Sequence, residues 1–427
     1  MEVKKNQIDD FNRDLITNHQ MEFEFLSSKL NSRGVDVESI IRDMEELQIA
    51  IPSWALGAGG TRFGRFAQGG TPGNLQEKIK DVGLIHHLTH SAGKISLHIP
   101  WDIPENPTEI VALAKENALE FDAMNSNTFQ DQEGQKLSYK LGSLSHVNSN
   151  VRQQAIDHNK KVIDYGCELG SKSLTVWLAD GSNHPGQSNF RRALNNTFKS
   201  LESIYNHMPE DWSLYIEYKP FEPYFYSTVI PDWGTSFHLA SSLGERAFTL
   251  VDLGHHLPNT NIEQIVSTLI SAGKLGGFHF NDSKFADDDL TVGSIKPYQL
   301  FLIFNEIVQG MNDNVGGNPP IAYMIDASHN IKDPIVDLIQ SLDSIGLSYI
   351  KSRIIDSKSL NDAQLKEDTV LASEIINDAF QTDVRSILRE YRRRHGAPLD
   401  AVRFFEKNEL RSQLIDERGR NNLTTGL

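Results

Sequence analysis

Cysteine is nearly absent from this chain of 427 residues, because Cys167 is the only one and an intramolecular disulfide is therefore excluded. The N-terminal segment also lacks the apolar core of a signal peptide. No apolar run approaches the roughly 18 residues that a membrane-spanning helix needs. These absences predict a protein of the reducing cytoplasm that has no membrane span.

Basic residues are also fewer than acidic ones. The chain has 41 Lys and Arg residues against 57 Asp and Glu residues, which gives a formal net charge of −16. A field of this sign repels phosphate backbones and anionic membrane surfaces, so we expect neither nucleic acid nor a membrane as a partner. The hydrophobic content of 39% and the charged content of 23% are those of an ordinary globular protein.

Apolar residues recur at helical spacing near both ends of the chain, whereas short β-rich runs alternate with longer segments between them. Eight such runs over roughly 300 residues favour an α/β fold of the (β/α)8 TIM barrel type. The alternative is a doubly wound open sheet, although no Gly-rich dinucleotide-binding turn follows the first run. We predict N-terminal helices in residues 1–46, the barrel in 47–349, and a C-terminal helical extension, used in oligomerisation, in 350–427. The predicted strands lie in residues 49–54, 95–101, 119–124, 173–178, 214–218, 248–253, 277–280 and 321–325.

Residues able to bind metal, transfer a proton or stack on a ligand follow nearly every predicted strand. Any one of them could be a helix N-cap or an ordinary hydrogen-bonded histidine. In a barrel, however, the C-terminal strand ends converge on one rim, where active sites lie. These residues are Trp54, His98, Trp101, Asp102, Asn125, Asn127, Trp177, Asp180, Glu217, Lys219, Asp252, His255, His279, Asn281, Asp282, Asp326 and His329.

Three carboxylates and one imidazole end four consecutive predicted strands: Glu217, Asp252, His279 and Asp326. Several carboxylates cannot lie together in a dry environment unless they are protonated or share a cation. Mixed oxygen and nitrogen ligands suit Mn²⁺, Mg²⁺, Co²⁺ or Zn²⁺. The alternative is that these four residues are unrelated caps and ion pairs.

A second set of candidate ligands follows the first. His255 comes three residues after a strand-end carboxylate, and Asp287 and Asp289 belong to an acidic run in the loop after His279. Such a run alone could be a solvated loop. With Glu217 as a bridge, His255, Asp287 and Asp289 would complete a second site for a divalent ion.

Lys219 follows Glu217 by two residues, so on a strand both side chains project to the same side. A lysine at the inner rim of a barrel needs anionic partners or a ligand oxygen, so we interpret Lys219 as an oxygen-binding residue. Trp54, Trp101 and Trp177 could be core residues or the apolar walls of a sugar site.

The glycine-rich segment 57–73 lacks the Gly-Lys-Ser/Thr ending of a phosphate-binding loop. A long βα loop that carries Phe63 and Phe66 is better interpreted as a lid or as a contact between subunits.

Several stretches together give the chain a resemblance to L-rhamnose isomerases of the pseudomonad type, which are ketose–aldose isomerases of broad sugar specificity. The resemblance extends from about residue 20 to residue 400, and EYKPFEP resembles a motif of the related xylose isomerases. The stretches are IPSWALGAGGTRF, SLHIPWD, FDAMNSNTF, YKLGSLSH, LTVWLADGSNHPGQSNF, YSTV, VDLGHHLPNTNIE, GKLGGFHFNDSKFADDDL and MIDASHN.

This resemblance implies a homotetramer with two divalent metal ions in each subunit, of which Mn²⁺ is the expected kind. One departure is Tyr218, where these enzymes carry histidine; lying between two inward-facing residues, Tyr218 should face the helices. The implied ligands are Glu217, Asp252, His279 and Asp326 for a structural ion, and Glu217, His255, Asp287 and Asp289 for a catalytic ion. The implied substrate-pocket residues are Trp54, His98, Trp177 and Lys219, with Phe63 reaching a neighbouring subunit's site.

The resulting hypothesis is a metal-dependent isomerase that converts L-rhamnose to L-rhamnulose and accepts other aldoses. Lys219 would act near O1 or O2 of the sugar, and His98 would assist ring opening or hold O5. Because metal engages the strand-end carboxylates, a metal-assisted 1,2-hydride shift is favoured over an enediol route. The alternatives are a metal-dependent hydrolase, such as an endonuclease, and a non-catalytic sugar-binding protein.

Overall fold

The structure is a computed structural model that describes residues 3–57, 68–222, 225–285, 287–313, 321–327 and 331–420. Three residues singled out from the sequence, Phe63, Phe66 and His329, lie outside the described residues.

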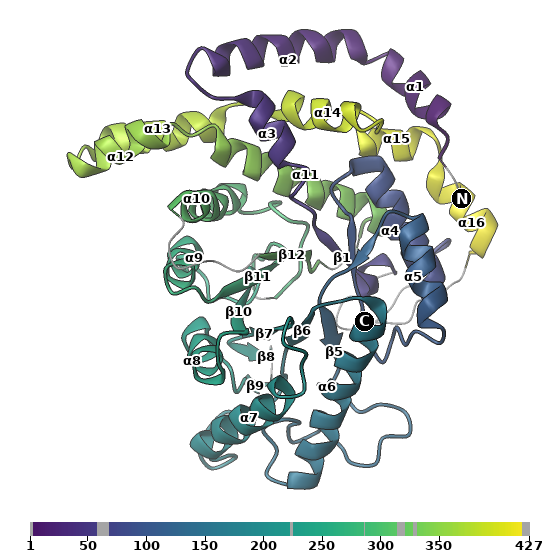
Figure 1. The fold of residues 1–427 in the computed structure, drawn as a ribbon, viewed down its shortest axis with the longest axis vertical. Coiled ribbons are helices and arrows are strands. Elements are labelled where there is room, and N and C mark those ends of the chain that lie inside the picture. The colour runs from purple at the N-terminus through teal and green to yellow at the C-terminus, as the bar shows by residue number, and fades with distance from the viewer. Residues whose placement is uncertain are drawn as a thin grey trace.

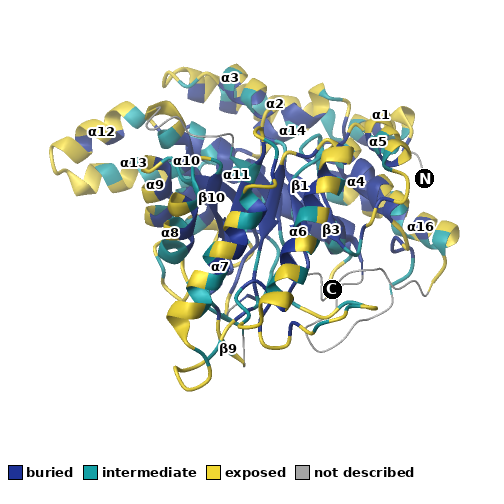
Figure 2. Cartoon of the chain, turned by 60° about the horizontal axis from the view of Figure 1, so that its bottom comes forward, coloured by how far each residue is buried: buried dark blue, intermediate teal, exposed yellow. Residues whose placement is uncertain are grey.

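A curled parallel sheet of ten strands forms the centre of the molecule (Figure 1). The buried strands occupy the middle and exposed helical faces surround them (Figure 2). In sheet order the strands are β3 (His98–Ile99), β5 (Met124–Ser126), β6 (Ser173–Val176), β7 (Ser213–Glu217), β10 (Ala247–Asp252), β11 (Leu275–Phe280), β12 (Ala322–Ile325), β1 (Ala50–Pro52), β2 (Lys94–Ser96) and β4 (Glu120–Phe121).

Each of the eight predicted strand segments overlaps at least one of these strands, which confirms the predicted parallel sheet. Two segments are interrupted: β2 and β3 lie on either side of Leu97, and β4 and β5 flank Asp122 and Ala123. β1 pairs with β12 on one side and with β2 on the other, while β2 pairs with β4 and β3 with β5. A short antiparallel pair, β8 (Phe221–Glu222) and β9 (Tyr226–Ser227), follows β7.

Helices cover the outside of the sheet, and many of them begin at an Asn or Asp whose side chain accepts a backbone hydrogen bond, as Asn74 and Asp333 do. Within the described residues, no helix has both the length and the apolar character needed to cross a membrane. The helices next to the strands are α4 (Leu75–Thr89), α5 (Pro107–Glu116), α6 (Ser149–Leu169), α7 (Phe190–Tyr205), α8 (Trp233–Leu243), α9 (Ile262–Ser271), α10 (Pro297–Asp313) and α11 (Pro334–Arg353).

Two groups of terminal helices pack beside one another at one side of the molecule, where α14 contacts both α2 and α3 (Figure 1). The pair α12 and α13 extends away from the body as an arm. α11 continues through position 350, where the C-terminal extension was predicted to begin, and the two predicted domain boundaries stay predictions. The terminal helices are α1 (Lys5–Arg13), α2 (Ile16–Asn31), α3 (Val37–Asp43), α12 (Ser357–Leu365), α13 (Thr369–Gln381), α14 (Arg385–Arg394), α15 (Ala401–Lys407) and α16 (Leu410–Arg418).

Candidate active site

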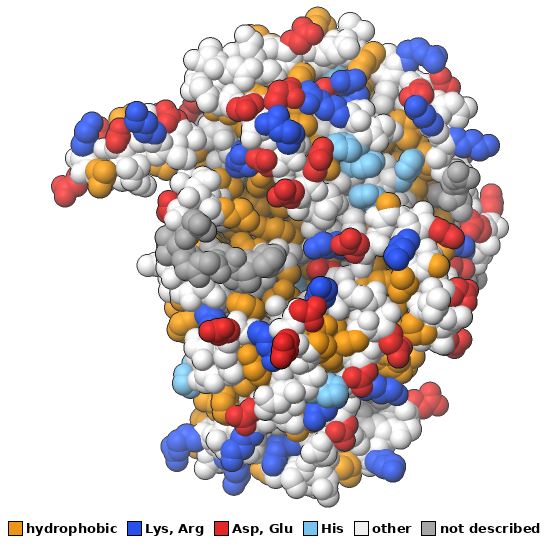
Figure 3. Space-filling model, in the orientation of Figure 1, with side chains coloured by type: hydrophobic (Ala, Val, Ile, Leu, Met, Phe, Trp, Pro, Cys, Tyr) orange, Lys and Arg blue, Asp and Glu red, His pale blue; other side chains and the backbone are white. Residues whose placement is uncertain are grey.

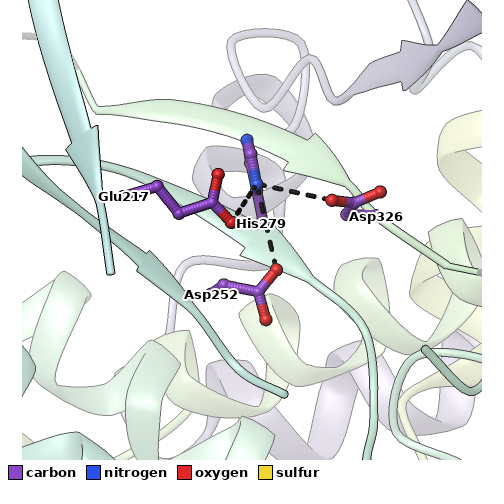
Figure 4. A group of neighbouring side chains, drawn as sticks. All are labelled: Glu217, Asp252, His279 and Asp326. Carbon is purple, nitrogen blue, oxygen red and sulfur yellow. Dashed lines mark hydrogen bonds and ion pairs between the residues drawn. The ribbon is translucent and has the colours of Figure 1, made fainter. Parts of the chain in front are cut away.

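Four side chains from neighbouring strand ends form a compact buried cluster: Glu217, Asp252, His279 and Asp326 (Figure 4). Parallel pairing places Asp252 beside His279, and the candidate ligand atoms of all four residues lie within 4.8 Å of one another. The Nδ1 atom of His279 is central: it lies 3.2 Å from Glu217 Oε1, 3.8 Å from Asp252 Oδ2 and 3.6 Å from Asp326 Oδ2. The sequence-based grouping of these four residues is thus found in the structure.

The cluster is electrostatically coupled. Burial alone would lower the pKa of His279, but the charge of Glu217 and its hydrogen bond outweigh this and raise the pKa to about 9. Burial, together with the charges of Asp252 and Glu217, raises the pKa of Asp326 to about 6 despite the opposing His279 charge. Burial would raise the pKa of Glu217, yet the two nearby imidazoles, His279 and His255, hold it below its usual range.

The donor set fits a divalent cation. Three carboxylates converge on one imidazole nitrogen, and three of the four residues are almost completely buried, so their negative charge needs a compensating positive one. Asp252 is held in place by bonds to one of its oxygens from the Gly254 N–H at 2.7 Å and the Asn281 amide at 3.0 Å. Such supporting bonds are typical of carboxylates that ligate metal. This cluster could therefore hold a metal ion.

The residues of the second predicted ligand set lie next to the first. His255 Nδ1 lies 3.2 Å from Glu217 Oε1, and its Nε2 lies 3.0 Å from Asp287 Oδ1. Asn281 reaches Asp289 Oδ1 at 3.4 Å with the same amide nitrogen that contacts Asp252. Glu217 is thus in contact with an imidazole of each set, as expected for a bridging residue.

The acidic run 287–289 divides into two kinds of carboxylate. Asp287 and Asp289 have left-handed backbone conformations, with φ of 51° and 45°. The side chain of Asp288 instead accepts hydrogen bonds within its own loop, from the Ser283 hydroxyl at 2.7 Å and the Lys284 N–H at 2.9 Å. The alternating backbone therefore turns two carboxylates toward the cluster and uses the third to hold the loop.

Lys219 joins the charged cluster to an aromatic region. Its Nζ lies 2.5 Å from Asp287 Oδ2 and 2.9 Å from Glu222 Oε2. The same ammonium group lies 5.1 Å from the centre of the Trp177 ring, within cation–π range. The predicted anionic pairing of Lys219 is present, and Glu222 is a partner that the sequence did not reveal.

Five aromatic rings form the other side of the site. His98 stacks on Trp101 with ring centroids 4.1 Å apart and makes an edge contact with Trp54 at 5.2 Å. Phe129 touches His98 at 5.7 Å and Trp177 at 4.8 Å, and so connects the early strand ends to the later ones. We call these five residues the aromatic wall.

The aromatic wall and the charged cluster meet at two places, because Trp54 Nε1 donates a hydrogen bond to Asp326 Oδ1 at 3.1 Å and Lys219 lies over Trp177. These contacts therefore connect side chains that lie in or shortly after each of the eight predicted strand segments. Burial, with smaller contributions from His158 and Lys78, lowers the pKa of His98 to about 3, so this imidazole is neutral near pH 7. Its Nδ1 atom is buried and has no hydrogen-bond partner among the described residues.

The structure brings the predicted metal ligands and substrate-pocket residues together in this arrangement, apart from Phe63, which lies outside the described residues. Of the other strand-end candidates, Asp180 and Asp282 accept hydrogen bonds from loop residues instead. Phe129, Glu222 and Asn281 were not among the predicted ligands or pocket residues. Phe129 ends the quoted stretch FDAMNSNTF and Asn281 follows a predicted strand, so both had a signal in the sequence. Glu222 lies in the quoted stretch EYKPFEP, three residues after Lys219, so it too had a signal in the sequence.

Comparison with known proteins identifies the family. A protein of Rhizobium meliloti named "probable sugar isomerase" is 46% identical over 406 residues, which are 95% of this chain and 94% of that protein. The chain belongs to this sugar isomerase family. A second family member so named, from Mesorhizobium japonicum, is 46% identical over 399 residues, covering 93% of this chain and 92% of that protein. No family model matches the chain.

This sugar isomerase family member is also similar to more distant enzymes and to solved structures. The L-rhamnose isomerase of Klebsiella pneumoniae (strain 342) is 29% identical over 194 residues, which are 39% of this chain and 45% of that enzyme. An L-ribulose 3-epimerase structure has a TM-score of 0.51 at 14% identity and covers 72% of this chain and 95% of its own. A D-allulose 3-epimerase of Methylomonas sp. has a TM-score of 0.50 at 12% identity, with coverage of 72% and 97%. The two structures share the fold with this chain.

Proposed function

We propose that this chain is a metal-dependent aldose–ketose isomerase that converts L-rhamnose to L-rhamnulose and also accepts other aldoses. The observation that carries the proposal is the contact between a cation-binding cluster and a wall of aromatic rings at one set of strand ends. A sugar presents hydroxyls to charged groups and C–H faces to aromatic rings, so it needs both kinds of surface. The partial similarity to L-rhamnose isomerases supports L-rhamnose as the first substrate to test.

The proposal includes a closed (β/α)8 barrel. If β2 with β3 and β4 with β5 each count as one interrupted barrel strand, the parallel pairings return from β12 to β1 after eight strands. Closure would bring all eight strand ends to one rim and account for contacts that extend over all of them.

Two divalent ions complete the proposed site. Glu217, Asp252, His279 and Asp326 would hold one ion, and Glu217, His255, Asp287 and Asp289 the other. We propose Mn²⁺, with Co²⁺, Mg²⁺ and Zn²⁺ as alternatives that suit the same mixed ligands. Bound divalent ions would polarise the two sugar oxygens between which the carbonyl group moves.

The chain's own residues would bind and orient the sugar. Lys219, fixed between Asp287 and Glu222, would place its ammonium group at O1 or O2 and stabilise negative charge that develops there. His98 is neutral and has an unpaired ring nitrogen among the described residues, which suits a hydrogen bond to O5 or to the opening ring. Trp54, Trp101 and Trp177 would exclude water from the reacting carbons.

We propose a 1,2-hydride shift rather than an enediol route. Proton removal from C2 requires a free carboxylate or imidazole above that carbon. The carboxylates of Glu217, Asp287 and Asp326 each lie within 4 Å of a charged partner in the site. A group so engaged is a poor base.

The function is tested by removing metal with a chelator, restoring each ion separately, and assaying a panel of aldoses with NMR analysis of the products. We expect a ketose from L-rhamnose only after a divalent ion is restored. Products epimeric at C3, or no change in any aldose, would contradict the proposal. Substrate deuterated at C2 should keep its label in ordinary water, whereas washout to solvent would indicate the enediol route.

We further propose a cytoplasmic homotetramer. The arm formed by α12 and α13 extends from the body and exposes Leu365 and Val370 at 76% and 73%, which favours burial against another subunit. Acidic and basic side chains are interspersed on the face shown in Figure 3, without a basic stripe that would suit nucleic acid. Light scattering tests the tetramer, and a monomer that is active at nanomolar concentration would contradict it.

A further inference from the structure

Two buried ion pairs lie one turn apart on α4. Lys78 Nζ contacts Asp102 Oδ1 at 2.6 Å, and both side chains are 1% exposed. On the next turn, the carboxylate of Asp81 accepts two hydrogen bonds from the Arg418 guanidinium, at 2.6 and 2.8 Å. Since Arg418 belongs to α16, one helix of the sheet's outer layer connects the C-terminal helix to Asp102.

Asp102 in turn supports the aromatic wall. Its Oδ2 atom accepts hydrogen bonds from the Ser53 hydroxyl at 2.5 Å and from the His98 N–H at 3.0 Å. Ser53 directly precedes Trp54, and the His98 ring stacks on Trp101. One buried carboxylate therefore holds the Ser53 side chain, just after β1, and the backbone of His98, at the start of β3.

α16 makes a second contact, with α11. Arg411 donates two hydrogen bonds to the carboxylate of Asp333, at 2.6 and 2.8 Å. Asp333 is the N-cap of α11 and also accepts from the Ile335 N–H. α11 is the helix that follows β12 and Asp326, so Arg411 holds the beginning of the helix next to the charged cluster.

The end of the glycine-rich segment lies against α16. The Gly70 N–H donates to Gly419 O at 2.9 Å, and its carbonyl accepts from Arg411 at 3.1 Å and from Arg418 at 3.2 Å. A Cβ atom on Gly70 would come within 2.9 Å of the Ile415 backbone nitrogen, and its φ of +75° is left-handed. Glycine is required here because the backbone packs directly on α16.

We propose that α16 is a positioning element for the sugar site, and that Arg411 and Arg418 are positioning residues acting through α11 and α4. This inference rests on the proposed function for its kinetic readout. Arg418 orders the aromatic wall through Asp81, Lys78 and Asp102. Arg411 fixes the start of α11 and the segment that leads from residue 68 into α4. The contacts of both arginines with the described residues involve α4, the start of α11 and residues 69–70, outside the sugar site.

The first experiment compares Arg411→Met and Arg411→Lys with Arg392→Met in the full metal-loaded chain. Arg392 pairs with Asp343 and likewise joins the C-terminal helices to α11, but away from α16, so it is a matched control. We expect Arg411→Met to raise KM for the aldose roughly fivefold to tenfold, with a smaller decrease in kcat and unchanged metal content. Arg411→Lys should recover part of the loss, and the control should retain wild-type KM. Equal KM values in all folded variants would overturn the proposal.

Arg418→Met alone would leave Asp81 buried without its partner, so the second variant is the double substitution Arg418→Met with Asp81→Leu. Hydrogen exchange then gives a readout that does not depend on catalysis. We expect the amides of residues 68–73 and 98–102 to exchange faster than in the wild type, while those of β10 and β11 stay unchanged. Unchanged protection in both segments would overturn the positioning role. A wild-type protein inactive on every aldose would contradict the proposed function alone.

Discussion

Two imidazoles of the same site, His279 in the charged cluster and His98 in the aromatic wall, have pKa values shifted in opposite directions. Burial lowers both, but carboxylates surround His279 and raise its pKa to about 9, whereas His98 lies among rings and its pKa falls to about 3. Burial alone therefore does not determine the state of a histidine here. The neighbouring side chains make one side of the site rich in buried charge, which suits a cation, and leave the other side neutral and largely apolar.

The two sides should consequently respond differently to substitution. In the charged cluster buried acidic and basic groups lie in contact, so removal of one changes the charge that its neighbours experience in a buried environment. In the aromatic wall the contacts between rings are dispersive, and each contributes a small free energy that adds to the others. We expect large losses of metal and activity on the first side, and moderate losses of sugar affinity on the second.

Glu217→Gln should have the largest effect. Glu217 lies 3.2 Å from both His255 and His279, closer than Asp252 at 3.9 and 3.8 Å, so the amide removes the carboxylate charge that contacts both imidazoles more closely. We expect kcat/KM to fall by roughly a hundredfold or more and the bound metal to decrease. Elemental analysis and aldose kinetics measure both. Wild-type activity with two ions still bound would contradict the bridging role.

Lys219→Met tests the junction between the two sides. The substitution keeps the length of the side chain but removes the ammonium group that lies between Asp287 and Glu222. If Lys219 stabilises an oxyanion, kcat should fall by roughly a hundredfold while the aromatic wall retains most of the sugar affinity. Steady-state kinetics in saturating metal separates kcat from KM. Unchanged values of both would exclude this role.

Metal affinity should depend on pH through the charged cluster. In the metal-free protein Asp326 holds a proton below about pH 6 and His279 below about pH 9. A cation must displace those protons, so affinity should increase as pH rises, by roughly tenfold per unit between pH 6 and 9, and decrease on acidification. Mn²⁺ titrations at several pH values measure this. His98 is neutral throughout this range, so a pH-independent metal affinity would contradict the ligand assignment of His279.

The sequence predicted the strand segments because strands buried on both faces give nearly continuous apolar runs. It predicted the four-residue cluster because parallel strands place their carboxyl ends at one edge. The interruptions at Leu97 and at residues 122–123 were not visible, since they depend on pairing with neighbouring strands. The hydrophobic pattern stays the same whether such a strand is continuous or broken.

The direction of side chains in loops was the main feature of the site that the sequence could not predict. Within Asp287, Asp288 and Asp289 the composition is uniform, and only the left-handed conformations of the first and third residues decide which carboxylates face the cluster. Phe129 is similar: it follows the end of β5 in a loop, where no periodicity gives its direction. Long-range contacts such as that of Arg418 with Asp81 leave no local signal at all.

Phe129→Leu tests whether the aromatic wall can be changed without affecting the charged cluster. The substitution keeps an apolar side chain but loses the ring contacts to His98, Trp101 and Trp177. Aromatic pairs contribute about 0.5–1.5 kcal/mol, so KM should rise roughly threefold to tenfold with metal content unchanged. Phe190→Leu, at a half-exposed ring on α7, is the control. Loss of metal from Phe129→Leu would show that the two sides are not separable.

Tyr218→Phe should have the smallest effect, and it tests the layer behind the charged cluster. Tyr218 is 1% exposed, and its hydroxyl lies 2.7 Å from Nε2 of His256, the residue that follows His255. This hydrogen bond ties the end of β7 to the turn after β10 from behind. A neutral hydrogen bond contributes about 0.5–1.5 kcal/mol, and the phenyl ring still fills the core position. We therefore expect a small decrease in thermal stability and a change in kcat/KM within roughly threefold.

Calorimetry and aldose kinetics measure the two effects, with Tyr218→His as a second variant that carries the imidazole expected from the resemblance. A loss of activity as large as that of Lys219→Met would place Tyr218 in the site itself, and would contradict the prediction that it faces the helices.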